Sequence, residues 1–157
     1  MLIHWVWYAT RTGMGDKTKS VLLSHFEDPE AIYFAPEPEL ERFEDLSPAA
    51  VESLMEKELR ECERILDRCR EQGIHILTFQ DAAYPARLKN IPDPPMVLYY
   101  KGTIPAFDEL PVIGVVGTRK ASVYGLTTAK RMGYQIAACG GCVVSGMATG
   151  IDGVAMK

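Results

Sequence analysis

The longest regular pattern in the chain is a stripe of apolar side chains between residues 48 and 72. Its members recur every three or four positions, which places them on one face of an α-helix. They are Val51, Leu54, Met55, Leu59, Cys62, Ile65, Leu66 and Cys69. Ser47-Pro48 suits the start of a helix and Gly73 suits its end. The pattern therefore predicts one amphipathic helix over residues 48–72.

Shorter helices are expected before this one. Gly13 and Gly15 permit a tight turn, after which Asp16 is the expected N-cap. Asp28-Pro29 begins another short helix, since proline is favoured at the first helical position. Residues 35–39 are expected to form a connector. Together these elements predict a small helical domain over residues 1–72.

After Gly73 the pattern changes to short apolar runs. We expect strands at 74–79, 96–100, 112–116 and 142–145, and a helix at 124–138 with Ser122 as its N-cap. The run at 112–116 is apolar on both faces, which is typical of a buried parallel strand. With the following helix and strand it forms one βαβ unit. The fold class is therefore α/β, with a second domain over residues 73–157 whose parallel sheet is incomplete.

Charge is divided unevenly along the chain. The net charge of −4 argues against a nucleic-acid partner. However, residues 1–70 contain nine Lys/Arg and fifteen Asp/Glu, whereas residues 71–157 contain eight and six. From Pro111 onward, five basic residues are opposed by Asp152 alone. An anion site is therefore expected in the second part of the chain.

The cysteines and histidines do not indicate a metal or redox centre. Cys139 and Cys142 have C-x-x-C spacing, but they follow a helical stretch, so no helix N-terminus would lower a thiol pKa. The other cysteines and the histidines lack metal-ligand spacing. The N-terminus lacks the pattern of a signal peptide, and no apolar run approaches the roughly 20 residues that cross a bilayer. We expect a cytoplasmic protein with no metal and no membrane contact.

Two glycine-rich segments follow the strands of the βαβ unit. If the strands are parallel neighbours, both segments meet at the carboxyl ends of the strands, where α/β folds bind ligands. A helix N-terminus and an arginine fork both suit phosphate. The candidate phosphate-binding residues are Gly117, Thr118, Arg119, Lys120, Ser122, Ser145, Gly146 and Gly150. Glycines also make ordinary turns after strands, so the residues alone leave both interpretations open. Neither a G-x-G-x-x-G nor a Walker pattern occurs, so no cofactor is expected.

Four motifs in order resemble the DprA (Smf) family. Tyr84-Pro85 through Tyr99 follows the pattern Y-P-x-x-L-x-x-I-x-D-P-P-x-V-L-Y, and Gly117-Thr118-Arg119 matches a Gly-Ser-Arg motif with Thr for Ser. Ser122 and Tyr124-Gly125 show S-x-Y-G spacing, and residues 145–152 read S-G-x-A-x-G-I-D. The front helices, with Gly13-Met-Gly15, resemble the family's N-terminal domain.

The resemblance implies a fold and a function. The fold would be a SAM-like (helix-hairpin-helix-like) domain followed by the first part of an extended Rossmann-like sheet. The protein would bind single-stranded DNA in a basic pocket, protect incoming DNA, and load the RecA recombinase during natural transformation (competence) and DNA recombination. It would not be an enzyme, and it would form a homodimer whose surface is expected to lie outside these residues.

Three departures from the family pattern and two alternatives remain. Thr149 stands where the family commonly has Arg, Met156 replaces a usual His, and the chain stops after about two strands of the sheet.

One alternative is a Rossmann-like nucleotide-binding enzyme of the phosphoribohydrolase type, although its acidic residue and G-G-x-G-T loop are missing. The other is a truncated fragment with only a protein-contact function.

Overall fold

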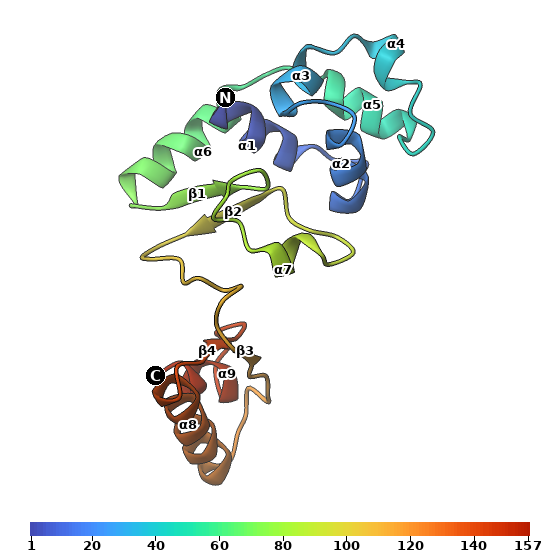
Figure 1. The fold of residues 1–157 in the computed structure, drawn as a ribbon. Helices are drawn as coiled ribbons and strands as arrows, with labels where there is room; N and C mark the ends of the chain where they lie inside the picture. Colours follow the sequence, from blue (N-terminus) through green and yellow to red (C-terminus); the bar gives the residue numbers. More distant parts are fainter. The chain divides into compact units, whose positions relative to one another are not determined.

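Short helices form where the first 72 residues place a capping residue before an apolar stretch. In the computed structural model, which describes residues 1–157, they are α1 (Leu2–Thr10), α2 (Asp16–Leu23), α3 (Pro29–Phe34), α4 (Glu37–Leu40), α5 (Pro48–Met55) and α6 (Arg60–Glu71) (Figure 1). Asp28 accepts a hydrogen bond from the Ala31 N–H, and Ser47 accepts one from the Ala50 N–H. Both predicted caps are confirmed.

Two local predictions are wrong. Gly15, and not Asp16, is the N-cap of α2, because Asp93 from a distant loop accepts the Lys17 N–H at 2.6 Å and replaces a local cap. The predicted connector at 35–39 contains the beginning of α4. This helix has proline in its first turn, where the fixed φ of proline favours helical backbone.

The predicted helix over residues 48–72 is two helices. Backbone at 56–59 leaves the helix, and Glu56 is extended. The freed carbonyls are bound by side chains from α1 and α3: Trp7 Nε1 donates to the Glu56 oxygen at 2.8 Å, and the Tyr33 hydroxyl donates to the Lys57 oxygen at 2.7 Å. These bonds satisfy polar groups that would be costly to leave unpaired, so the chain can turn although the apolar spacing continues.

A two-stranded antiparallel sheet completes the first unit. Strands β1 (His75–Thr78) and β2 (Val97–Tyr100) pair with His75 opposite Tyr100, and the short helix α7 (Ala86–Lys89) lies between them in sequence. The proline-rich loop is held by the Tyr84 hydroxyl, which donates to the Pro95 oxygen at 2.8 Å. Met96 and Val97 join the core of the helices.

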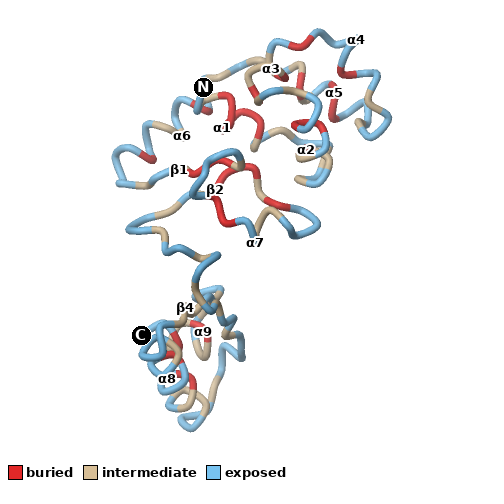
Figure 2. The backbone as a smooth tube through the Cα atoms, in the orientation of Figure 1, coloured by how far each residue is buried: buried red, intermediate tan, exposed pale blue.

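The core of this unit is aromatic and aliphatic. Figure 2 shows the buried backbone concentrated here. Its fully buried side chains include Trp7, Tyr8, Leu22, Ile32, Leu40, Leu54 and Met96. The chain divides into two compact units: the first runs from Met1 to Ile104 and the second from Pro105 to Lys157. Assignment of residues 73–104 to the domain of the parallel sheet stays a prediction.

The second unit is the predicted βαβ arrangement. Strand β3 (Val112–Gly114) pairs in parallel with β4 (Cys142–Val144), and α8 (Val123–Ala138) connects them. Helix α9 (Ile151–Ala155) follows and packs on α8. Ser122 caps α8 by accepting the Gly125 N–H, as predicted. The strands are shorter than the predicted runs at 112–116 and 142–145.

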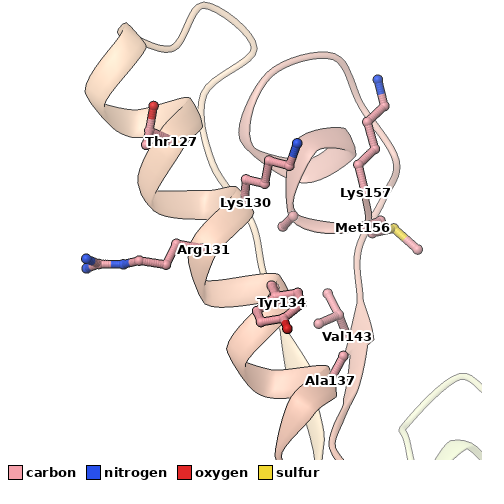
Figure 3. Close-up of a pocket in the computed structure, with 10 residues that line it drawn as sticks. Thr127, Lys130, Arg131, Tyr134, Ala137, Val143, Met156 and Lys157 are labelled. Carbon is pink, nitrogen blue, oxygen red and sulfur yellow. The ribbon is translucent and has the colours of Figure 1, made fainter.

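The apolar run at 112–116 is largely exposed in this structure. Ile113 is 42% exposed and Val116 is 82% exposed, because only two strands are present and little covers them. A hollow of about 620 Å³ lies along α8 and α9, with Gly133, Ala137, Val143 and Ala155 among its lining residues. Lys130 points toward the α9 side and Arg131 points away from it (Figure 3). No helix of the chain is long and apolar enough to cross a bilayer.

Removing the Tyr33 hydroxyl tests the explanation of the helix break. Tyr33→Phe leaves the Lys57 oxygen unpaired, so we expect the free energy of unfolding to fall by about 1–3 kcal/mol. Tyr99→Phe is the control, because Tyr99 is 47% exposed in the same unit. It should change the free energy by less than about 0.5 kcal/mol. Urea denaturation measures both, and equal losses would contradict the explanation.

Candidate nucleic-acid interface

The parallel pairing brings two loops to one edge of the sheet. The first loop (residues 117–122) follows β3 and the second loop (residues 145–150) follows β4. Pairing continues past the strands, because the Val115 N–H donates to the Val144 oxygen at 3.0 Å. The Ser145 hydroxyl then donates to the Val115 oxygen at 2.8 Å. The expectation that both segments meet at the carboxyl ends of neighbouring strands is confirmed.

The two loops contact each other directly. The Ile151 N–H, just after the second loop, donates to the Thr118 oxygen at 3.3 Å. Gly150 has a φ of +96°, and a methyl group there would overlap the Thr118 carbonyl oxygen and lie 2.8 Å from the Arg119 backbone. A methyl group at Gly117 would meet the Ile151 side chain at 2.6 Å. Glycine is therefore required sterically at both positions.

A buried carboxylate lies where the loops meet. Asp152 is only 5% exposed, and its Oδ1 accepts the Gly117 N–H at 2.9 Å. Its Oδ2 lies 3.4 Å from the position that a methyl group on Gly146 would take. Asp152 therefore bonds to the first loop and lies close to the start of the second. The sequence pattern marked this residue only as a member of a motif and as the one acid after Pro111.

Several predicted site residues use their polar groups within the protein. The Gly117 N–H is taken by Asp152, and the Ser145 hydroxyl by Val115. Ser122 caps the helix, and Thr118 Oγ1 accepts the Lys120 N–H at 3.2 Å. These groups shape the loops, and their direct contact with phosphate stays a prediction.

The groups that remain for an anion lie at the rim of the loops. Arg119 and Lys120 are exposed and form no ion pair. At the start of α8, the N–H groups of Val123 and Tyr124 have no acceptor within the helix, as in any helix N-terminus. The other basic residues of the unit, Lys130, Arg131 and Lys157, line the hollow along α8 and α9 instead. Positive charge beside the loops therefore comes from Arg119 and Lys120.

Comparison with known proteins identifies the family. Residues 75–157, more than half of the chain, match the sequence profile of the DNA recombination-mediator protein A family. The chain belongs to this family. All three motifs of the site lie within the matched residues, together with the tyrosine and proline motif of the first unit.

Curated DprA and Smf proteins show the same similarity. The chain is 36% identical over 111 residues to the DNA processing protein DprA of Bacillus subtilis, which covers 71% of this chain and 37% of that protein. It is 28% identical over 153 residues to protein Smf of Synechocystis, which covers 95% of this chain and 38% of that protein. The chain thus spans less than two fifths of these DprA/Smf relatives.

The fold of this family member is shared by a solved structure. The DNA processing protein A of Streptococcus pneumoniae superposes with a TM-score of 0.72 and 22% identity, over 99% of this chain and 52% of that one. The predicted α/β class, with front helices followed by the first part of a Rossmann-like sheet, is confirmed.

The apposition of the loops can be tested at Gly150. Gly150→Ala is expected to break the bond from the Ile151 N–H to the Thr118 oxygen, because the methyl group overlaps that oxygen. Strain of about 1–3 kcal/mol should speed hydrogen exchange at the Ile151 amide by roughly tenfold or more. Gly140→Ala is the matched control, with a φ of +78° but open space around the added methyl. If hydrogen exchange at the Ile151 amide were accelerated equally in both variants, backbone strain and not the contact between the loops would explain the effect.

Proposed function

We propose that this chain is the front part of a protein that binds single-stranded DNA, protects incoming DNA and loads the RecA recombinase. The observation that carries the proposal is the pair of glycine-rich loops at one sheet edge, with Arg119 and Lys120 exposed beside them. Cations next to backbone N–H groups suit a sugar-phosphate backbone. The setting would be natural transformation and recombination in the cytoplasm.

The form of the site favours a single strand over a duplex. Tyr124 follows the first loop and is 81% exposed, which offers a base a ring to stack on. Stacking requires an unpaired base, whereas the phosphate contacts are independent of sequence.

The proposed partners follow from the family. RecA would be contacted by the full-length protein, which would be a homodimer. The proposal includes no catalytic step. A hydrolase of the phosphoribohydrolase type would need a carboxylate facing its substrate, and Asp152, the acid at these loops, is buried and bonded to Gly117.

Binding should prefer a single strand and weaken with salt. Fluorescence anisotropy with a labelled oligothymidylate, alone and annealed to its complement, would measure the preference. The affinity for the single strand should fall as salt rises, because phosphate contacts release counterions. Equal affinity for the duplex would contradict the proposal.

Arg119→Ala is expected to weaken binding of the oligothymidylate more than Lys120→Ala or Arg131→Ala. Loss of a charged hydrogen-bond donor should cost about 1.5–3 kcal/mol. Arg131→Ala is the charge-matched control, since Arg131 lies mid-helix and away from the loops. Circular dichroism checks that each variant is folded. Equal losses in all three variants would indicate diffuse attraction instead of a defined site.

A further inference from the structure

The loop that carries Arg119 is hydrogen-bonded to the start of α9. The Gly117 N–H donates to Asp152 Oδ1 at 2.9 Å. The Ile151 N–H donates to the Thr118 oxygen at 3.3 Å. Gly117 and Thr118 directly precede Arg119, so both bonds act on the backbone from which its exposed side chain extends. The position of α9 is therefore linked to the position of this guanidinium at the surface.

Gly133 allows α9 to lie close against α8. It is a buried residue of α8, and a methyl group there would overlap the Ala155 carbonyl oxygen of α9. An α-helix rises about 1.5 Å per residue, so Gly133 lies roughly 16 Å along α8 from the cap at Ser122. A residue distant from the first loop thus controls how closely α9 can approach α8.

We infer that Asp152 and Gly133 are positioning residues for the binding of a single strand at Arg119. Gly133 lets α9 pack on α8, and Asp152, in the first turn of α9, holds the first loop through the Gly117 N–H. Both act through Arg119 and not on the DNA itself. An arginine on a fixed loop loses less conformational freedom on binding, which favours affinity. The inference rests on the proposed function, because it explains what fixes the cation of that site.

Electrostatics alone predicts a different result at Asp152. Removing an acid from a unit that attracts a polyanion should leave binding unchanged or strengthen it. The positioning role predicts a loss, because the Gly117 N–H loses its acceptor and the loop must then be ordered when DNA binds. Asp152→Ala is therefore expected to weaken binding of a labelled oligothymidylate roughly two- to tenfold by fluorescence anisotropy. Glu109→Ala is the control, since Glu109 is an exposed acid of the same unit.

Helix propensity alone likewise predicts a different result at Gly133. Alanine is normally more stable than glycine inside a helix. Gly133→Ala should instead lower the melting temperature and weaken binding of the oligothymidylate roughly two- to tenfold, because the methyl group displaces α9 and Asp152 with it. Gly114→Ala is the control, because a methyl group there meets open space in the same unit.

Two readouts separate positioning from a general loss of structure. Hydrogen exchange at the Gly117 amide should be faster in Asp152→Ala and in Gly133→Ala. Asp152→Asn retains an oxygen acceptor, so it should restore most of the protection and most of the affinity. In a double-mutant cycle, Asp152→Ala should weaken binding little further in the Arg119→Ala background, because the loop then no longer carries the cation.

The inference would be overturned by wild-type affinity in Asp152→Ala or Gly133→Ala, by additive losses in the cycle, or by equal losses in the control variants. Should Asp152→Ala be unfolded by circular dichroism, Gly133→Ala carries the same test with Asp152 in place. Failure of the wild type to bind the oligothymidylate would instead overturn the proposed function. Exchange at the Gly117 amide would then still judge whether Asp152 and Gly133 hold the loop.

Discussion

Parallel pairing of two short strands controls the geometry of the second unit. Because β3 and β4 run in the same direction, both of the loops that follow them leave from one edge of the sheet. The crossover helix α8 must then begin at the first loop, which places its free N–H groups beside that edge. This arrangement brings Ile151 into contact with Thr118 and Asp152 into contact with Gly117.

In the first unit, the arrangement of the helices depends on hydrogen bonds to the carbonyl groups that are left free where the helix is interrupted between α5 and α6. Glu56 and Lys57 carry carbonyls with no helical partner, and the donors come from Trp7 and Tyr33. Arg11 adds a bond to the Glu56 oxygen at 3.1 Å. The Lys57 ammonium lies 5.1 Å from the Trp7 ring centroid, and burial together with the nearby Arg11 lowers its pKa. Helices α1 and α3 are thereby fixed against the turn between α5 and α6.

The sequence predicted features that depend on neighbouring residues. Asp28, Ser47 and Ser122 each accept an N–H three positions ahead, and a cap requires no more than that. The break between α5 and α6 was missed, because its donors lie up to 49 residues away while the local apolar spacing continues unbroken. The strands of the second unit were found from their apolar runs, but their exposure depends on how many strands pair.

The candidate site shows the same division between local and distant information. Glycines after apolar runs are a local signal, so the positions of the two loops were predicted correctly. Their internal bonds were not, because the Gly117 N–H and the Asp152 carboxylate are 35 residues apart in sequence. An aspartate in a run of small residues gives no sign of whether it faces solvent, a ligand or another loop. Only the fold shows that it accepts a hydrogen bond from the Gly117 N–H of the first loop.

Charge and burial together explain how an acid can lie within a site proposed for a polyanion. Residues 1–104 contain twelve Lys/Arg and eighteen Asp/Glu, whereas residues 105–157 contain five and three, so attraction for a polyanion arises in the second unit. Salt screens exposed charges beyond about 8–10 Å. The attraction for a polyanion therefore depends on cations that can touch the nucleic acid, as Arg119 and Lys120 can. Asp152 is buried and bonded to the Gly117 N–H, so its carboxylate lies inside the protein and not beside the exposed cations. A nucleic-acid backbone held at the surface by Arg119 and Lys120, as proposed, would meet these exposed cations and stay outside the packed loops.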